Sequence, residues 1–262
     1  MEVLKVPTMA DFMAEGKQPE VLFWVGSAGS FDDRAKKITK AFVKILNKAK
    51  VDFAVLGTEE SCTGDVAKRA GNEFLFQMQA LMNIEVLNAY EVKKIVTCDP
   101  HSFNCLKNEY PDLGGNYEVI HHTQFIQELI KSGRLKIQGN LYKGKRITFH
   151  DPCYLGRANN EYDAPRDILK NTNASIVEMK LHKRTALCCG AGGAQMFKEP
   201  EKGDKDINVL RTEGALETSP NIIATACPYC NTMMTDGIKA KEKETEISVL
   251  DIAELIANSE EL

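Results

Sequence analysis

The sequence has no long apolar run. No stretch approaches the ~18 apolar residues that a membrane-spanning helix needs, and residues 1–20 are polar, without the apolar core of a signal peptide. It also has no excess of positive charge, since the net charge is −4 and the pI is about 5.8. A nucleic-acid-binding surface would need a basic patch. We therefore expect a cytoplasmic protein with no membrane span of its own and no nucleic-acid partner.

Two common cofactor signatures are also missing. The chain lacks the tight C-x2-C-x2-C run of ordinary ferredoxins and has no glycine fingerprint for flavin or nicotinamide. It nevertheless contains eight cysteines. Because cytoplasmic thiols stay reduced, cysteines with regular spacing are more typical there of metal ligands or redox groups than of a disulfide framework.

Hydrophobic residues make up 43% of the 262-residue chain, which is enough for one large domain or two of about 130 residues. Short runs rich in Val, Ile and Phe alternate with longer amphipathic stretches, and this alternation predicts parallel sheets with helices on their faces. The expected strands are 21–26, 52–57, 93–97, 117–121, 146–149, 175–179, 221–226 and 247–251. The expected helices are 32–50, 67–90, 104–110, 123–131, 164–170, 206–217, 231–243 and 252–258.

Two of the expected helices have apolar residues at helical spacing. In 32–50 these residues are Ile38, Phe42, Ile45 and Leu46. In 67–90 they are Phe74, Met78, Leu81, Ile84 and Leu87. We expect both faces to pack in the core and assign them no functional role.

Five cysteines in the second half form the main motif: Cys153, Cys188, Cys189, Cys227 and Cys230. Two are adjacent, two form a C-x-x-C, and gaps of roughly one βα unit separate the groups. Cys153 and Cys227 follow expected strands, and the carboxyl ends of parallel strands are where such sheets bind ligands. A glycine-rich segment at 190–193 allows close approach of the backbone, and its amides could donate hydrogen bonds to sulfur. We therefore interpret the five cysteines as one metal centre.

The residues alone leave the metal open. Thiolates hold both iron-sulfur clusters and structural zinc, so the cysteine pattern favours neither. A redox dithiol at Cys227 and Cys230, as in a stand-alone thiol-disulfide reductase, is a weaker interpretation because it leaves the other three cysteines unexplained.

The two halves of the chain are related by a nearly constant offset of 126 to 130 residues. The offset pairs Cys153 with Ser27, Cys188 with Cys62, Cys189 with Thr63, Gly190 with Gly64, Cys227 with Asp99, Cys230 with Ser102, and residues 249–250 with 119–120. An internal duplication keeps such an offset, so the chain is expected to contain two copies of one α/β unit. Only the second copy has all five cysteines.

With these residues in hand, the chain resembles the cysteine-rich (CCG) domain proteins, which include a cysteine-rich subunit of heterodisulfide reductase and the iron-sulfur subunits of glycolate, lactate and glycerol-3-phosphate oxidising systems. The spacing matches the family pattern: one cysteine, thirty-four residues, Cys-Cys-Gly, thirty-six residues, and Cys-x-x-Cys. The flanking segments 150–157 (HDPCYLGR), 190–193 (GAGG) and 226–228 (ACP) match as well. The resemblance covers nearly the whole chain.

The resemblance implies two pseudo-repeated α/β lobes, each a small parallel sheet flanked by helices. We expect a polar N-terminal extension at 1–19, a first lobe at 20–132 with a degenerate motif, and a second lobe at 145–262 with the intact one. The polar stretch 132–145, with three glycines, is expected to link them. Residues 1–20 are expected either to dock a partner or to be disordered.

The resemblance also implies a function. We expect an electron-transfer subunit of a multisubunit oxidoreductase, active only with its partners, that binds one [4Fe-4S]-type cluster, cubane or noncubane, through Cys153, Cys188, Cys189, Cys227 and Cys230. The implied partner is a ferredoxin-type iron-sulfur subunit that is membrane-associated or flavin-linked, which would bring the chain to the inner membrane. The implied substrate couple is a disulfide, a quinone or a 2-hydroxy acid. The alternative is a zinc-stabilised scaffold without redox activity.

The first lobe departs from the family pattern at four of five positions. Serine and aspartate oxygens are poor replacements for thiolates at a cluster, so we expect a structural first lobe. Cys98 and Cys105 lie near the lost positions but out of register with them.

Four further side chains have two possible roles. His101 and His150 could relay protons or support the site, or else only cap strand ends by hydrogen bonds to the backbone. Arg157 and Arg166 could neutralise a thiolate cluster or orient an acidic substrate, or else be structural.

Overall fold

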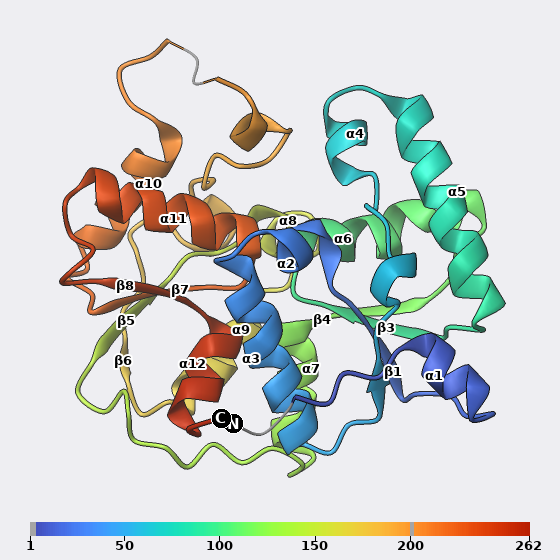
Figure 1. The fold of residues 1–262 in the computed structure, drawn as a ribbon. Helices are drawn as coiled ribbons and strands as arrows, with labels where there is room; N and C mark the ends of the chain where they lie inside the picture. The colour runs from blue at the N-terminus through green and yellow to red at the C-terminus, as the bar shows by residue number, and fades with distance from the viewer. Residues whose placement is uncertain (1–3, 200–201) are drawn as a thin grey trace.

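The computed structural model describes residues 4–199 and 202–262. The first half contains a parallel four-stranded sheet with the strand order β2-β1-β3-β4 (Figure 1). Its strands are β1 (Val21–Trp24), β2 (Phe53–Ala54), β3 (Lys94–Thr97) and β4 (Glu118–His121). Strand β1 is buried along its whole length, as expected for a parallel strand covered by helices on both faces.

The second half repeats this arrangement with the order β6-β5-β7-β8. Its strands are β5 (Arg146–Phe149), β6 (Ser175–Ile176), β7 (Ile222–Thr225) and β8 (Ser248–Asp251). The predicted α/β fold of two pseudo-repeated lobes is confirmed. The edge strands β2 and β6 are two residues each, shorter than the predicted 52–57 and 175–179, because an edge strand pairs with one neighbour only.

Helices surround both sheets. The first lobe contains α1 (Met9–Ala14), α2 (Gly26–Phe31), α3 (Ala35–Lys48), α4 (Asp65–Arg69), α5 (Glu73–Ala89), α6 (Pro100–Asn104) and α7 (His122–Lys131). The second contains α8 (Cys153–Gly156), α9 (Asp163–Lys170), α10 (Ile207–Leu216), α11 (Pro228–Ala240) and α12 (Ile252–Ser259).

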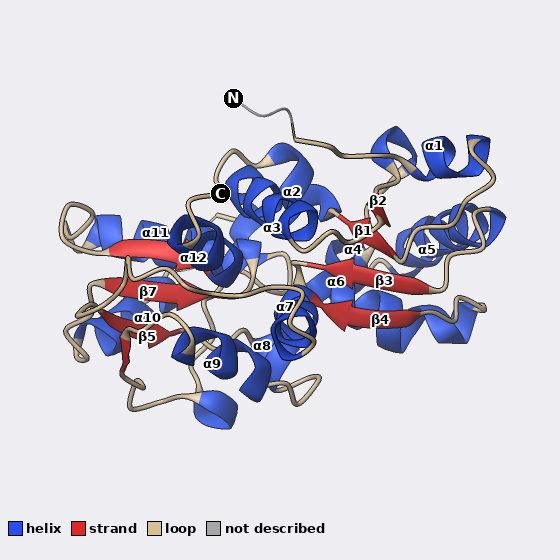
Figure 2. Cartoon of the chain, turned by 90° about the horizontal axis from the view of Figure 1, so that it is seen from below, coloured by secondary structure: helices blue, strands red, loops and turns tan. Residues whose placement is uncertain are grey.

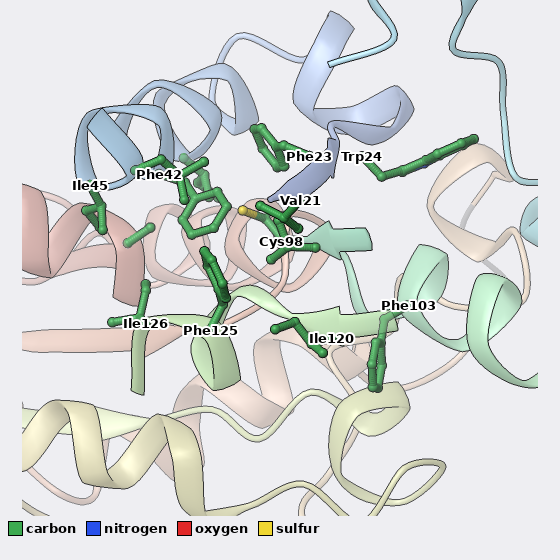
Figure 3. Close-up of a cluster of buried hydrophobic side chains, with 14 of the residues drawn as sticks. Val21, Phe23, Trp24, Phe42, Ile45, Cys98, Phe103, Ile120, Phe125 and Ile126 are labelled. Atoms are coloured by element: carbon green, nitrogen blue, oxygen red, sulfur yellow. The ribbon is translucent and has the colours of Figure 1, made fainter. Parts of the chain in front are cut away.

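The apolar face predicted for 32–50 is confirmed in α3. Its four predicted core residues are Ile38, Phe42, Ile45 and Leu46, and each is at most 1% exposed. The Phe42 ring packs edge-on against Phe23 of β1, with 5.0 Å between ring centroids (Figure 3). Burying each of these side chains stabilises the fold by roughly 1.5–3 kcal/mol.

The prediction for 67–90 is partly wrong. Two helices occupy this region, because the chain turns at Gly71, which has a positive φ of 87°, and α5 starts afresh with Asn72 accepting a hydrogen bond from the Leu75 N–H. Ile84 and Leu87 are buried as predicted. The other three predicted core residues are exposed, namely Phe74 (76%), Met78 (45%) and Leu81 (51%). Helix α5 has apolar residues on all sides, so spacing alone does not indicate which side meets the protein.

Two other helix boundaries differ from prediction. The helix predicted at 104–110 begins earlier, as α6, because Asp99 caps it and Pro100 fits its first position; it then continues as a π-helical turn, Cys105–Glu109. Helix α11 begins at Pro228 rather than at 231, since this proline also fits the first helical position.

The duplication extends to the junction of the last strand and helix in each lobe. The His121 N–H donates to Gln124 before α7, and the Asp251 N–H donates to Glu254 before α12, so equivalent positions form equivalent capping boxes. This shared detail supports an origin of both lobes from one unit.

The two lobes meet at the carboxyl ends of their strands. In Figure 2 the arrows of β3 and β4 point towards the second sheet, and that of β7 points towards the first. At the junction His122 Nε2 lies 3.0 Å from Asp251 Oδ1, with both side chains fully buried. Arg34 of the first lobe binds both carboxylate oxygens of Glu254 of the second at 2.7 Å. One hydrophobic core continues through both lobes.

The segments outside the lobes also pack against them. The predicted linker 132–145 has turns in place of helix or strand, but Leu135 and Tyr142 in it are buried. Residues 1–3 lie outside the described residues; farther along, α1 packs on the first lobe, where Met9 is 2% exposed. The limits 20–132 and 145–262 remain our proposal for the lobes. Among the described helices, none has the length and apolar character needed to cross a bilayer.

Candidate metal centre

The five cysteines of the second lobe lie at one edge of its sheet. Cys153 is the first residue of α8, shortly after β5, and Cys227 is the N-cap residue of α11, shortly after β7. Cys230 lies in the first turn of α11, while Cys188 and Cys189 lie in the loop between β6 and α10. Because β5 and β7 are paired in parallel, their carboxyl ends meet and bring together cysteines that are far apart in the sequence.

The five sulfur atoms form a connected series. The Cys230 thiol donates a hydrogen bond to the Cys189 sulfur at 3.3 Å and also contacts Cys227. The thiols of Cys153 and Cys189 both donate to the Cys188 sulfur. The structure therefore brings all five cysteines together.

The burial of the sulfurs is uneven. Cys189, Cys227 and Cys230 are at most 3% exposed, whereas Cys153 and Cys188 are half-buried. All eight cysteines of the chain are free thiols. The centre is thus closed on the side of β7 and α11 and open on the side of Cys153 and Cys188.

Gly190 follows the cysteine pair for a conformational reason. Its φ of +92° lies in the left-handed region that disfavours other residues, and its N–H donates to the Cys188 sulfur at 3.3 Å. The equivalent Gly64 has a φ of +86°, and its N–H donates to the Cys62 sulfur at 3.4 Å. The Cys-x-Gly turn is therefore preserved in both lobes, even where the metal ligands are not.

The hydrogen bonds between the thiols determine where negative charge resides. Donation from Cys153 and Cys189 lowers the pKa of the Cys188 thiol far below its usual range. The same bonds raise the pKa of Cys153 and Cys189, which donate them. One thiolate is thus shared among neighbouring thiols. A metal centre held by the whole set would displace the remaining thiol protons.

A histidine and an arginine lie behind the sulfurs. One ring nitrogen of His150, the Cys189 sulfur and the Cys230 sulfur all lie within 4.8 Å of one another. Arg211 Nε donates to His150 Nδ1 at 2.9 Å, and Arg211 Nη1 donates to the Leu181 carbonyl at 2.7 Å. Burial, together with the Arg211 charge, lowers the pKa of His150 to about 3. His150 Nε2 and Arg211 Nη2 are buried and find no partner among the described residues.

The sequence gave no direct indication of Arg211, although a weak signal was present. It lies on α10 between residues that face the core, and a charged residue on such a face is buried only with partners. The two arginines considered from the sequence have structural contacts. Arg166 pairs with Asp151 at 2.8 Å and with Glu178 at 2.6 Å, and Arg157 donates to the Ala186 carbonyl.

In the first lobe, protein hydrogen bonds occupy the positions equivalent to the cysteines. Beside Ser27, the N–H groups of Val25 and Gly26 donate to the Glu60 carboxylate at 2.9 and 2.6 Å. Asp99, equivalent to Cys227, accepts from the N–H groups of His101 and Ser102 and so caps α6. The Ser102 hydroxyl, equivalent to the Cys230 sulfur, also donates to Asp99 at 2.8 Å.

The other first-lobe cysteines do not replace the lost ones. The Cys105 thiol donates to Glu109 at 3.3 Å, and burial raises its pKa far above the usual range. Burial raises the pKa of the Cys98 thiol in the same way. Both are therefore neutral thiols that pack within the first lobe.

His101 of the first lobe reaches the second. Its Nδ1 lies 2.9 Å from Asp65 Oδ2, and Arg69 donates to the other Asp65 oxygen at 3.1 Å. The His101 ring lies 4.3 Å from the ring of Tyr154 and 5.5 Å from that of Tyr229, measured between centroids. Because these tyrosines adjoin Cys153 and Cys230, the first lobe covers part of the cysteine site. Sequence reasoning noted His101 but missed Asp65.

A cavity of about 520 Å³ adjoins the same site. Gly190, Met196 and Met233 line it on the side of the cysteines, and Lys198 and Lys205 line it on the outer side. Met196 and Met233 also pack against the cysteine cluster, so the cavity leads from the surface to the neighbourhood of the sulfurs.

The fold and the gathered thiols define a duplicated α/β protein with one thiol-rich centre. The chain belongs to the cysteine-rich domain (CCG) family, which it matches over residues 21–107 and 147–235, one match in each lobe. This membership confirms the resemblance that the motif indicated.

Three relatives are similar over nearly the whole chain. The "probable iron-sulfur-binding oxidoreductase FadF" of Bacillus subtilis is 51% identical over 97% of this chain and 36% of its own length. The "EtfAB:quinone oxidoreductase" of Syntrophomonas wolfei is 46% identical over 92% and 34%. One of the subunits of the dihydromethanophenazine:CoB–CoM heterodisulfide reductase of Methanosarcina barkeri is 33% identical over 92% and 59%. The chain thus spans about a third of the first two relatives.

Proposed function

We propose that this chain binds one [4Fe-4S]-type cluster and transfers electrons as part of a multisubunit oxidoreductase. The proposed ligands are Cys153, Cys188, Cys189, Cys227 and Cys230. The convergence of their five sulfurs at one sheet edge carries the proposal. Thiolates are the usual ligands of such clusters.

The surroundings of the sulfurs fit such a group. Cluster sulfur accepts hydrogen bonds, and the buried donors His150 Nε2 and Arg211 Nη2 need acceptors. The Gly190 amide already points at sulfur. A buried guanidinium also compensates for the negative charge of a thiolate-rich centre. When bound, the cluster would supply one-electron chemistry.

We infer that electrons arrive from another chain or domain. Relatives with "iron-sulfur-binding oxidoreductase" or "quinone oxidoreductase" in their names are about three times as long as the matched region. The companion is proposed to be a ferredoxin-type iron-sulfur protein, membrane-associated or flavin-linked. A quinone or a disulfide, which the relatives' names mention, is the proposed terminal couple.

Metal analysis of anaerobically purified protein tests the proposal. We expect about four iron per chain with a broad visible absorption that bleaches on reduction. One zinc per chain and no colour would overturn the proposal and favour the zinc-stabilised scaffold.

A further inference from the structure

His150 is held rigidly between two elements of the second lobe. It directly follows β5, its N–H donates to the Ala224 carbonyl of β7 at 2.9 Å, and its side chain is fully buried. On one side of the ring lies Arg211, itself 1% exposed. On the other side lie the sulfurs of Cys189 and Cys230.

The contact with Arg211 fixes the tautomer of His150. An arginine nitrogen always carries hydrogen and never accepts, so His150 Nδ1 must accept the 2.9 Å bond from Arg211 Nε through its lone pair. A ring whose Nδ1 has a free lone pair is neutral. A neutral ring has one N–H group, and it must therefore be at Nε2.

This tautomer is the opposite of the one expected for a histidine that ligates a metal. Such a histidine binds the metal through one nitrogen and donates its other N–H to a carboxylate, carbonyl or water. Here the other nitrogen receives a proton donor. Ligation through Nε2 would leave a ring without any N–H, an anionic imidazolate buried beside thiolates, which is strongly unfavourable.

The Nε2–H group is instead a buried donor that requires an acceptor. It has none among the described residues. A buried donor is rarely left unpaired, because it has lost its hydrogen bonds to water. The polar groups known to lie near the ring are the sulfurs of Cys189 and Cys230.

We propose that His150 donates an Nε2–H···S hydrogen bond to the sulfur of the centre formed by Cys189 and Cys230, and that Arg211 fixes the tautomer that permits it. The inference rests on the proposed cluster. Hydrogen bonds to cluster sulfur stabilise the more negative, reduced state and raise the reduction potential. His150 is thus a positioning and tuning residue and not a sixth ligand.

Two substitutions in the full chain test this role. His150→Leu removes the donor, whereas His150→Gln keeps an amide N–H for sulfur and a carbonyl oxygen for Arg211. We expect both variants to keep the iron content of the wild type. The midpoint potential should fall in His150→Leu and return towards the wild-type value in His150→Gln. His182→Leu is the matched control, since His182 bonds to the Met179 carbonyl and its loss should leave the potential unchanged.

The other outcomes have distinct meanings. Loss of iron from both His150 variants, with wild-type circular dichroism, would identify a ligand and overturn the inference. Unchanged potentials in all variants would do the same. Wild-type protein without iron would overturn the proposed function itself, before any variant is compared.

A spectroscopic measurement does not depend on the variants folding. In protein labelled with ¹⁵N-histidine, pulsed EPR of the reduced cluster should show a weak nitrogen coupling, as expected through an N–H···S bond. A strong coupling, as from a nitrogen bound directly to iron, would contradict the proposal.

Discussion

The ring of His101 in the first lobe lies 4.3 Å from the ring of Tyr154 in the second, and Asp65 holds it there through a 2.9 Å hydrogen bond. The degenerate lobe therefore contributes directly to the surroundings of the cysteine site. Burial disfavours protonation of His101, but the Asp65 carboxylate and nearby Asp99 outweigh it and raise the pKa to about 9.

The His101–Asp65 pair should be coupled in a pH-dependent way. A raised pKa contributes stability that is fully present below the unfolded value of about 6.5 and is lost as the pH rises through about 9. A double-mutant cycle with His101→Gln and Asp65→Asn, followed by urea unfolding, should give a coupling free energy of about 1–3 kcal/mol at pH 7. At pH 10 the coupling should be much smaller. Equal coupling at both pH values would contradict the assignment of a charged His101.

Cys189→Ala distinguishes the two cluster types. Cys189 is buried and connects Cys188 to Cys230, so we expect its loss to abolish the cluster spectrum, as in a noncubane centre held by all five cysteines. A cubane needs four thiolates only. Retention of four iron and of the visible absorption in Cys189→Ala would therefore assign the cubane form.

Cys62 and Cys188 form a matched pair for locating the cluster. Each accepts a hydrogen bond from the N–H of the glycine two residues later, at 3.4 and 3.3 Å. We expect Cys188→Ser to lose most of its iron and Cys62→Ser to keep all of it. A fall of about half in Cys62→Ser would instead indicate a second cluster in the first lobe.

Glu60 should make the first lobe sensitive to pH. Burial raises the pKa of its carboxyl to about 7, although the Val25 and Gly26 N–H groups oppose the shift. The contribution to stability is complete below about pH 4.5 and is lost as the pH rises through about 7, at a cost of about 3 kcal/mol. Glu60→Gln should remove this part of the pH dependence, so the difference in unfolding free energy between variant and wild type should change between about pH 5.5 and 8. A constant difference would show that Glu60 is charged throughout.

Gly139 tests how tightly the connection between the lobes is packed. A Cβ at this position would lie 1.8 Å from the Ser259 carbonyl oxygen of α12, so Gly139→Ala should destabilise the protein by at least about 1–3 kcal/mol. Gly214, within α10, has open space around it, and Gly214→Ala should stabilise the helix by about 0.5–1 kcal/mol. Thermal unfolding of both variants measures the contrast. A neutral Gly139→Ala would mean that the segment can shift away from α12 at little cost.

Several features could be read from the sequence because their signals are local. The alternation of strands and helices, the offset between the halves and the C-x-x-C after a strand all depend on neighbours or on simple counting. Helix α5 could not be read in this way. Its spacing predicted a core face that includes Phe74, which is 76% exposed, because a helix with apolar residues all round has no unique inner side.

The order of residues along the chain is enough to establish that two α/β units are repeated and that five cysteines lie in the second. The surroundings of those cysteines follow from tertiary packing alone. Arg211 reaches His150 from another helix, and His101 reaches Tyr154 from the other lobe. Such contacts depend on how distant elements pack. A side chain acquires its tautomer and its charge from the partners that packing brings to it, and no pattern along the chain records those partners.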